Sequence, residues 1–141
     1  MTFAGTNYLA VLIAAVVAWL AGAAWYMSLG RIWTSALGMT PAQMEARRKQ
    51  PGAHLPFIYV FLAELVMAWV LAGLLGHLGP GQVTLINGLI SGAFCWLGFV
   101  ITTMVANNAF AGRDPRLLLI DGGYWLLVLL LMGGIIGGMG V

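Results

Sequence analysis

Two carboxylic acids stand in stretches of the chain that are otherwise almost entirely apolar. Glu64 interrupts the apolar run 56–75, and Asp121 interrupts the run 117–136. A carboxylate in the hydrocarbon core of a bilayer costs at least about 2.5–3.5 kcal/mol, so such acids are rare and usually face partners or water. Both acids are therefore candidate sites for a proton or a cation.

Three interpretations of these acids remain open. In the first, they bind a proton or a cation in a transporter. In the second, they are structural acids that are hydrogen-bonded or paired with Arg113 or Arg116, because these long arginine side chains can reach in from a loop. The third interpretation, a carboxylate metal site, is the weakest because His54 and His77 are expected on opposite sides of the membrane. We expect no metal and no cofactor.

The composition indicates a membrane protein. Of the 141 residues 62% are hydrophobic and 7% charged, against roughly 45–50% and 25% in an average globular domain. Disordered chains have the opposite composition, and the six basic residues form no aromatic-interleaved patch of the kind that binds nucleic acid. With Cys95 as the single cysteine, a disulfide framework and a cysteine zinc site are both excluded.

Four stretches are long enough to cross a bilayer, which takes about 20 apolar residues. They are 8–27, 56–75, 83–105 and 117–136. The predicted fold is an all-α integral membrane four-helix bundle, with residues 1–141 forming a single membrane domain in contact with the lipid bilayer.

The basic residues predict how this bundle is oriented. All six lie in the loop 28–55 or between the third and fourth spans: Arg31, Arg47, Arg48, Lys49, Arg113 and Arg116. By the positive-inside rule both loops are cytoplasmic and both termini lie outside. Within the loop, Thr40 and Gln43 around Pro41 form a capping-box pattern, which predicts a short amphipathic helix over 41–49.

The same topology places the two acids in the cytoplasmic half of the membrane. At the rise of a helix, Glu64 lies about 12 Å and Asp121 about 6 Å from the cytoplasmic ends of their spans. Glu64 shares a ridge of small residues with Ala68 and Ala72, so we expect it to point into the protein. Five side chains at similar depth are candidate partners: Trp25, Tyr26, Thr102, Thr103 and Tyr124.

Several short motifs together resemble one family of small bacterial four-helix membrane proteins, domain of unknown function 1761. The motifs are Gly22-x-x-Trp25-Tyr26, Trp96-Leu97-Gly98-Phe99-Val100-x-Thr102-Thr103, Asn108-x-Phe110-x-Gly112-Arg113 and Asp121-x-x-Tyr124. The resemblance spans about residues 7–138 and implies a compact four-helix protein in the cytoplasmic (inner) membrane of a bacterium, without implying an activity. It adds Trp96, Asn107, Asn108 and Arg113 to the residues of interest.

The signatures of common enzymes are missing from the sequence, including a nucleophilic triad at membrane depth and a phosphate-binding glycine loop. The leading hypothesis is a small homo-oligomeric, proton-linked carrier or channel that uses Glu64 and Asp121. The alternative is a non-catalytic accessory or assembly subunit of a larger membrane complex. A lipid- or quinone-binding enzyme, suggested by the tryptophans, is a distant third.

Overall fold

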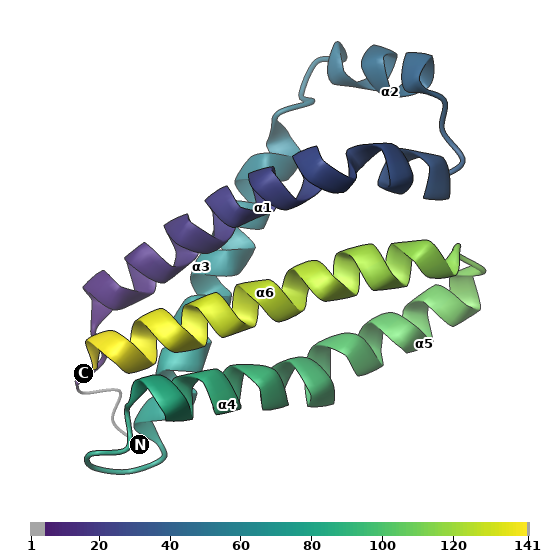
Figure 1. Cartoon of the computed structure of the whole chain (residues 1–141). Coiled ribbons are helices and arrows are strands. Elements are labelled where there is room, and N and C mark those ends of the chain that lie inside the picture. Colours follow the sequence, from purple (N-terminus) through teal and green to yellow (C-terminus); the bar gives the residue numbers. More distant parts are fainter. Residues whose placement is uncertain (1–4, 141) are drawn as a thin grey trace.

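The computed structural model describes residues 5–140, and within this range the chain is helical without strands (Figure 1). The elements are α1 (Tyr8–Ala36), α2 (Pro41–Arg48), α3 (Leu55–Gly76), α4 (Leu85–Cys95), η1 (Trp96–Val100), α5 (Ile101–Ala111) and α6 (Pro115–Met139). α4, η1 and α5 follow one another as a continuous rod, Leu85–Ala111. This rod, α1, α3 and α6 are each long and apolar enough to cross a membrane, which confirms the predicted four.

All four helices are longer in the structure than the predicted spans, and α1 differs the most. α1 continues from the predicted end at residue 27 to Ala36, because no proline interrupts it and the chain leaves the helix only at Gly38, which adopts a positive φ. The third span begins at Leu85, capped by the Thr84 side chain, and runs to Ala111. The length of an apolar stretch therefore underestimates the length of a helix that continues into polar residues.

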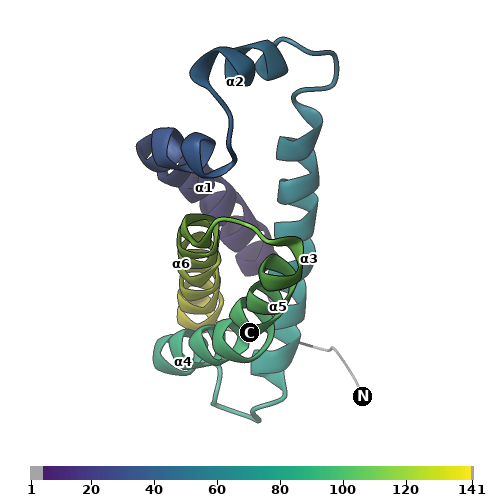
Figure 2. The same ribbon diagram turned by 90° about the vertical axis from the view of Figure 1, so that its right-hand side faces the viewer.

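α6 is the central helix of the molecule. It packs against α1 on one side and α4 on another, and it also contacts α3, η1 and α5 (Figure 2). α3 packs mainly against α1, whereas the rod Leu85–Ala111 packs mainly against α6. Most of the rod's surface is consequently exposed, as are many large apolar side chains of α1 and α3. Apolar surface on this scale is typical of helices that face lipid.

Glycines bring α4 and α6 into backbone contact. A side chain added at Gly88 would overlap the carbonyl oxygen of Gly133, and one added at Gly92 would overlap that of Leu129. Gly137 is equally close to the backbone of Thr84. In a bilayer, where apolar burial gives little driving force between helices, such close approach supplies the packing energy.

Alanines play the same role where α1 meets α3. Ala10, Ala14 and Ala18 on α1 are completely buried, as is Ala68 on α3. The ridge of small residues that was predicted beside Glu64 is therefore buried inside the protein. Together with residues of α6 these alanines form the core that surrounds Glu64.

The rod Leu85–Ala111 contains a π-helical turn, η1, that the sequence did not predict. A π turn adds one residue to a helical turn, so the side chains that follow it point in directions other than the regular 3.6-residue period predicts. η1 lies against α6, where the Trp96 indole donates a hydrogen bond of 2.8 Å to the Gly122 carbonyl. The turn therefore changes which face α5 presents to its neighbours.

All six basic residues lie at one end of the bundle. This end comprises the last turns of α1, α2 and its flanking loops, and the turn between α5 and α6 (Figure 1). α2 has the predicted capping box: Gln43 N donates to Thr40 Oγ1 and Thr40 N donates to Gln43 Oε1. The opposite end holds the start of α1, the α3–α4 turn and the end of α6.

Candidate functional site

Glu64 lies in the core of the molecule with 0% of its surface exposed. Its neighbours along the same face of α3 are the buried Ala68 and Ala72, so the prediction that this acid points inward is confirmed. Small side chains leave it room but provide no hydrogen bonds. Its polar partners must therefore come from other helices.

The partner of Glu64 is Tyr124 on α6. The Tyr124 hydroxyl is within hydrogen-bonding reach of both Glu64 Oε1 and the Ala18 carbonyl oxygen, the latter at 3.3 Å. A phenol carries a single hydrogen and can donate fully to only one acceptor. When Tyr124 donates to Ala18, its oxygen is free to accept a hydrogen bond from a protonated Glu64.

The second oxygen of Glu64 is also informative. Among residues 5–140, Glu64 Oε2 has no hydrogen-bond partner although it is buried. Leaving a buried polar atom unpaired is costly, and more costly when the group is charged. Hydrogen-bond counting therefore favours the neutral carboxylic acid in this packed arrangement.

Gly22 on α1 makes room for the pairing of Glu64 with Tyr124. A Cβ atom at Gly22 would lie 2.7 Å from Tyr124 Oη, closer than real Cβ contacts. Because Gly22 has no side chain, the Tyr124 phenol can extend from α6 past α1 and reach Glu64 on α3. Gly22 thus positions the hydroxyl without bonding to it.

Asp121, one turn before Tyr124 on α6, has a separate set of donors. Its Oδ1 accepts hydrogen bonds from the Tyr26 hydroxyl at 2.5 Å and from Trp33 Nε1 at 3.1 Å. Unlike Glu64 it is only partly buried and lies nearer the basic end. Both donors come from α1, on residues seven apart and hence on one face.

The two acids belong to one cluster because their tyrosine partners touch. The rings of Tyr26 and Tyr124 pack edge to face, with centroids 5.4 Å apart. Hereafter the acid–tyrosine cluster means five residues: Tyr26, Trp33, Glu64, Asp121 and Tyr124. It brings together α1, α3 and α6, with a buried acid at one end and a more accessible acid at the other.

Two tryptophans hold the backbone of α6 beside this cluster. Trp25 Nε1 donates to the Ile120 carbonyl at 3.0 Å, and Trp96 Nε1 donates to the Gly122 carbonyl at 2.8 Å. They approach α6 from α1 and η1 respectively. The segment of α6 that carries Asp121 is therefore fixed from two neighbouring helices.

Half of the predicted site residues lie elsewhere. The Thr102 and Thr103 hydroxyls donate to carbonyls of their own helix, at Gly98 and Phe99, and both side chains are exposed, so their predicted role as partners of the acids is wrong. Asn107 is also exposed. The physical reason is that similar depth in the membrane does not determine which way a side chain points, and these three side chains are exposed on α5.

The turn between α5 and α6 holds its charged residues in local contacts. Arg113 donates to Asn108 Oδ1 at 3.3 Å. Arg116 forms an ion pair of 2.8 Å with Asp114, whose pKa is held below its ordinary value by hydrogen bonds from the Arg116 side chain and backbone. The suggested pairing of Arg113 or Arg116 with Asp121 is therefore wrong, since Tyr26 and Trp33 bond that acid instead.

Trp33 is the cluster residue that the sequence analysis missed. The apolar run 8–27 predicts a first span that ends before Trp33. The signal was present in the spacing, since Trp33 follows Tyr26 by seven residues and α1 continues unbroken between them. Extending the helix by two turns places both side chains on the face that meets Asp121.

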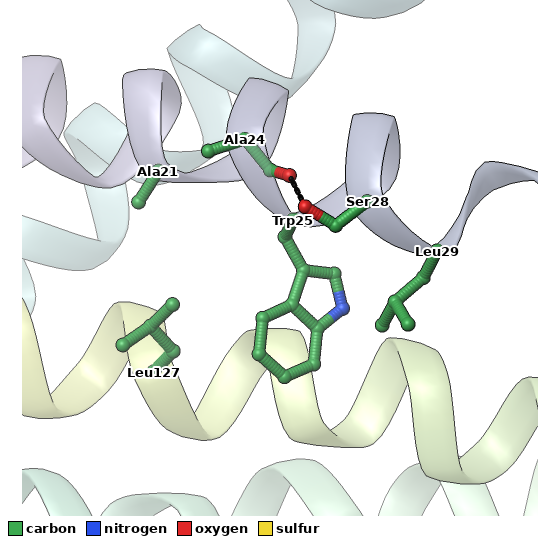
Figure 3. A pocket seen from close by; sticks show the side chains of 6 residues that line it. All are labelled: Ala21, Ala24, Trp25, Ser28, Leu29 and Leu127. Carbon is green, nitrogen blue, oxygen red and sulfur yellow. Dashed lines mark hydrogen bonds between the residues drawn. The ribbon is translucent and has the colours of Figure 1, made fainter.

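A groove runs along the outside of α1 and α6 near the cluster (Figure 3). Its volume is about 500 Å³. Its lining is apolar apart from the Ser28 hydroxyl, which donates to the Ala24 carbonyl, and comprises Ala21, Ala24, Trp25, Ser28, Leu29 and Leu127. In the described part of the chain, no three His, Cys, Asp or Glu side chains are grouped to hold a metal ion.

The fold and the site define the class: an all-helical protein with four apparently membrane-spanning helices and an acid enclosed among three of them. The family model described as "Protein of unknown function (DUF1761)" matches residues 9–137. The chain therefore belongs to this family, as the motifs indicated. No curated protein and no solved structure matches the chain.

Proposed function

We propose that the protein is a small proton-linked carrier or channel in which Glu64 takes up and releases a proton. The observation that carries this proposal is the state of Glu64, a fully buried acid with one phenol partner and an unpaired second oxygen. A purely structural polar group in a membrane core is expected to have its hydrogen bonds satisfied. A buried acid with an unpaired oxygen is instead suited to exchanging a proton.

The acid–tyrosine cluster supplies a second acidic position on the way to Glu64. Asp121 is partly exposed and lies toward the basic end, so it is the acid that protons from that side encounter first. Because Glu64 is enclosed, exchange requires α1, α3 and α6 to separate locally. Buried alanines make up part of the core between these helices, and their small side chains oppose such a movement less than large ones would.

We further propose that the working unit is a homo-oligomer in the cytoplasmic membrane of a bacterium, with the basic end facing the cytoplasm. Six basic residues at one end support the orientation through the positive-inside rule. A four-helix subunit with a packed interior leaves little room for a solute, so a permeation path fits better between subunits. The exposed rod Leu85–Ala111 offers a surface for such contacts.

The second candidate function is a non-catalytic accessory or assembly subunit of a larger membrane complex. It is favoured by the polar side chains on the outward face of α5, where Thr102, Thr103 and Asn107 are exposed. Polar groups that face a neighbouring protein rather than lipid can form hydrogen bonds across the contact. In this function the acid–tyrosine cluster only stabilises the fold.

Reconstitution distinguishes the two functions. The purified protein is placed in liposomes that contain a pH-sensitive dye, and a potassium diffusion potential is imposed. We expect proton entry above the protein-free background, and we expect Glu64→Gln to reduce it at least about tenfold, because the amide cannot exchange a proton in this range. Glu45→Gln, which removes an exposed acid on α2, serves as the matched control and leaves the flux unchanged.

Flux that persists in Glu64→Gln would contradict the proposal. The variant must also be folded, which thermal unfolding in detergent checks; glutamine has the shape of glutamate and can still pair with Tyr124. Absence of flux in the wild type, combined with stoichiometric partner proteins after mild solubilisation, would favour the accessory function instead.

A further inference from the structure

We infer that the groove between α1 and α6 is a binding site for an anionic phospholipid, with an acyl chain along the groove and the headgroup at Arg31. The site is distinct from the acid–tyrosine cluster and does not depend on proton transport. Its lining is described above and shown in Figure 3, in which Leu29 lies at the end nearer the last turns of α1.

The shape and chemistry of the groove suit an acyl chain. Its walls are aliphatic and aromatic, and small side chains at Ala21, Ala24 and Ser28 create the hollow. Two polar groups of Trp25 and Ser28 are already occupied, by the Ile120 and Ala24 carbonyls. The lining can therefore contact an apolar acyl chain, and it contains no unpaired polar group that a polar ligand would have to satisfy.

The groove opens toward the headgroup region. From Ala21 to Leu29, α1 rises about 12 Å toward the basic end. The helix has 29 residues, about 43 Å at helical rise, which exceeds the about 30 Å of a hydrocarbon core. Its last turns, including Arg31, therefore extend into the interface where lipid phosphates lie.

Arg31 is the cation placed to meet such a headgroup. It follows Ala24 by seven residues and Ser28 by three, so it lies on the side of α1 that borders the groove. A helical side chain leans toward the N-terminal turn, here toward the groove. Within residues 5–140 the ion pairs are Arg48–Glu45 and Arg116–Asp114. Arg31 is in neither of them, so its guanidinium can pair with an external anion.

Charge at this end selects the anionic headgroup over a zwitterionic one. Six basic residues and only two acids, Glu45 and Asp114, lie in the segments that form the basic end. A basic residue beside the headgroup contributes about 1 kcal/mol of attraction to anionic lipid, whereas Arg48 on α2 is already paired with Glu45. A phosphatidylglycerol-like headgroup gains this attraction, whereas the ammonium of phosphatidylcholine offsets it.

Native mass spectrometry of the purified protein tests the site. The protein is equilibrated in mild detergent with equal amounts of dioleoyl phosphatidylglycerol and dioleoyl phosphatidylcholine. We expect one phosphatidylglycerol to be retained preferentially, and Arg31→Gln to lower this preference about fivefold, the equivalent of about 1 kcal/mol. Arg48→Gln, which removes a cation from α2, is the charge control and changes the preference less than about twofold.

A second pair of variants tests the groove itself. Ala24→Leu places a larger side chain in the hollow and should abolish retention of either lipid, whereas Ala106→Leu on the exposed face of α5 should leave it intact. Equal retention of both lipids, or equal effects of the two arginine variants, would overturn the inference. A dimer without bound lipid that the Ala24→Leu substitution dissociates would also overturn the inference, because the groove would then bind a second copy of this chain.

Discussion

At the scale of single residues, the pairing of Glu64 with Tyr124 matters most for the core. Each group is buried, and the phenol is the one hydrogen-bond partner of the acid among residues 5–140. Removing one member of a buried pair leaves the other buried without a hydrogen bond, at the full free-energy cost of its desolvation. The pair therefore contributes to stability whether or not the acid also exchanges protons.

Replacing Tyr124 by phenylalanine separates this contribution from apolar packing. We expect Tyr124→Phe to destabilise the folded protein by about 1–3 kcal/mol, because the ring is kept and only the partner of the buried acid is lost. Tyr59→Phe is the control, since Tyr59 is 62% exposed and should shift stability little. Thermal unfolding in detergent measures both, and equal effects would show that the hydroxyl of Tyr124 has no special role.

The inward direction of Glu64 could be predicted from the sequence, because Ala68 and Ala72 share its face at four-residue steps. The identity of its partner could not, because Tyr124 follows by sixty residues and reaches Glu64 only through the space above Gly22. A local pattern carries no information on which helix crosses which. Tyr26 and Asp121 were both recognised as candidates, but their contact likewise depends on how α1 crosses α6.

At the scale of helices, the contact between α4 and α6 depends on glycines that two backbones share. Gly133 and Gly134 are adjacent in α6, yet they differ in surroundings. A Cβ at Gly133 would overlap the Gly88 carbonyl, whereas one at Gly134 would meet only Leu side chains, at 3.4 Å or more. Neighbouring positions of the same residue type thus provide a matched comparison.

We expect Gly133→Ala to destabilise the protein by about 2–3 kcal/mol, since the α4 and α6 backbones must move apart. Gly134→Ala should be close to neutral, because the leucine side chains can adjust. Unfolding temperatures of the two variants in the same detergent check the difference. If the two variants were equally stable, the backbone contact would not limit how closely these helices pack.

The existence and approximate position of all four long helices followed from hydropathy alone. The π turn did not, because Trp96–Val100 contains no residue type that requires one; what stabilises it is tertiary, including the bond from Trp96 to α6. Thr102 and Thr103 follow this turn; they were candidates because of their depth, which does not predict the direction of a side chain. Periodicity arguments apply only as far as the helix remains regular.

At the scale of the whole molecule, the basic end implies a fixed orientation in the membrane. In a Cys95→Ser background, a cysteine at Gln82, in the α3–α4 turn, should react with a membrane-impermeant maleimide on intact cells. A cysteine at Gln50, between α2 and α3, should react only after permeabilisation. The positive-inside rule gives this direction, and the reverse pattern would contradict it.

Because the central helix α6 follows α3 in the chain, the order of synthesis affects Glu64. The acid enters the membrane with α3, but its partner Tyr124 is added sixty residues later, about 3–12 s at ordinary rates of translation. During this interval α1 and α3 can already pack through their alanines around an acid that has no phenol. Arrival of α6 supplies the phenol, so this single hydrogen bond also reports that α6 has joined the helices made before it.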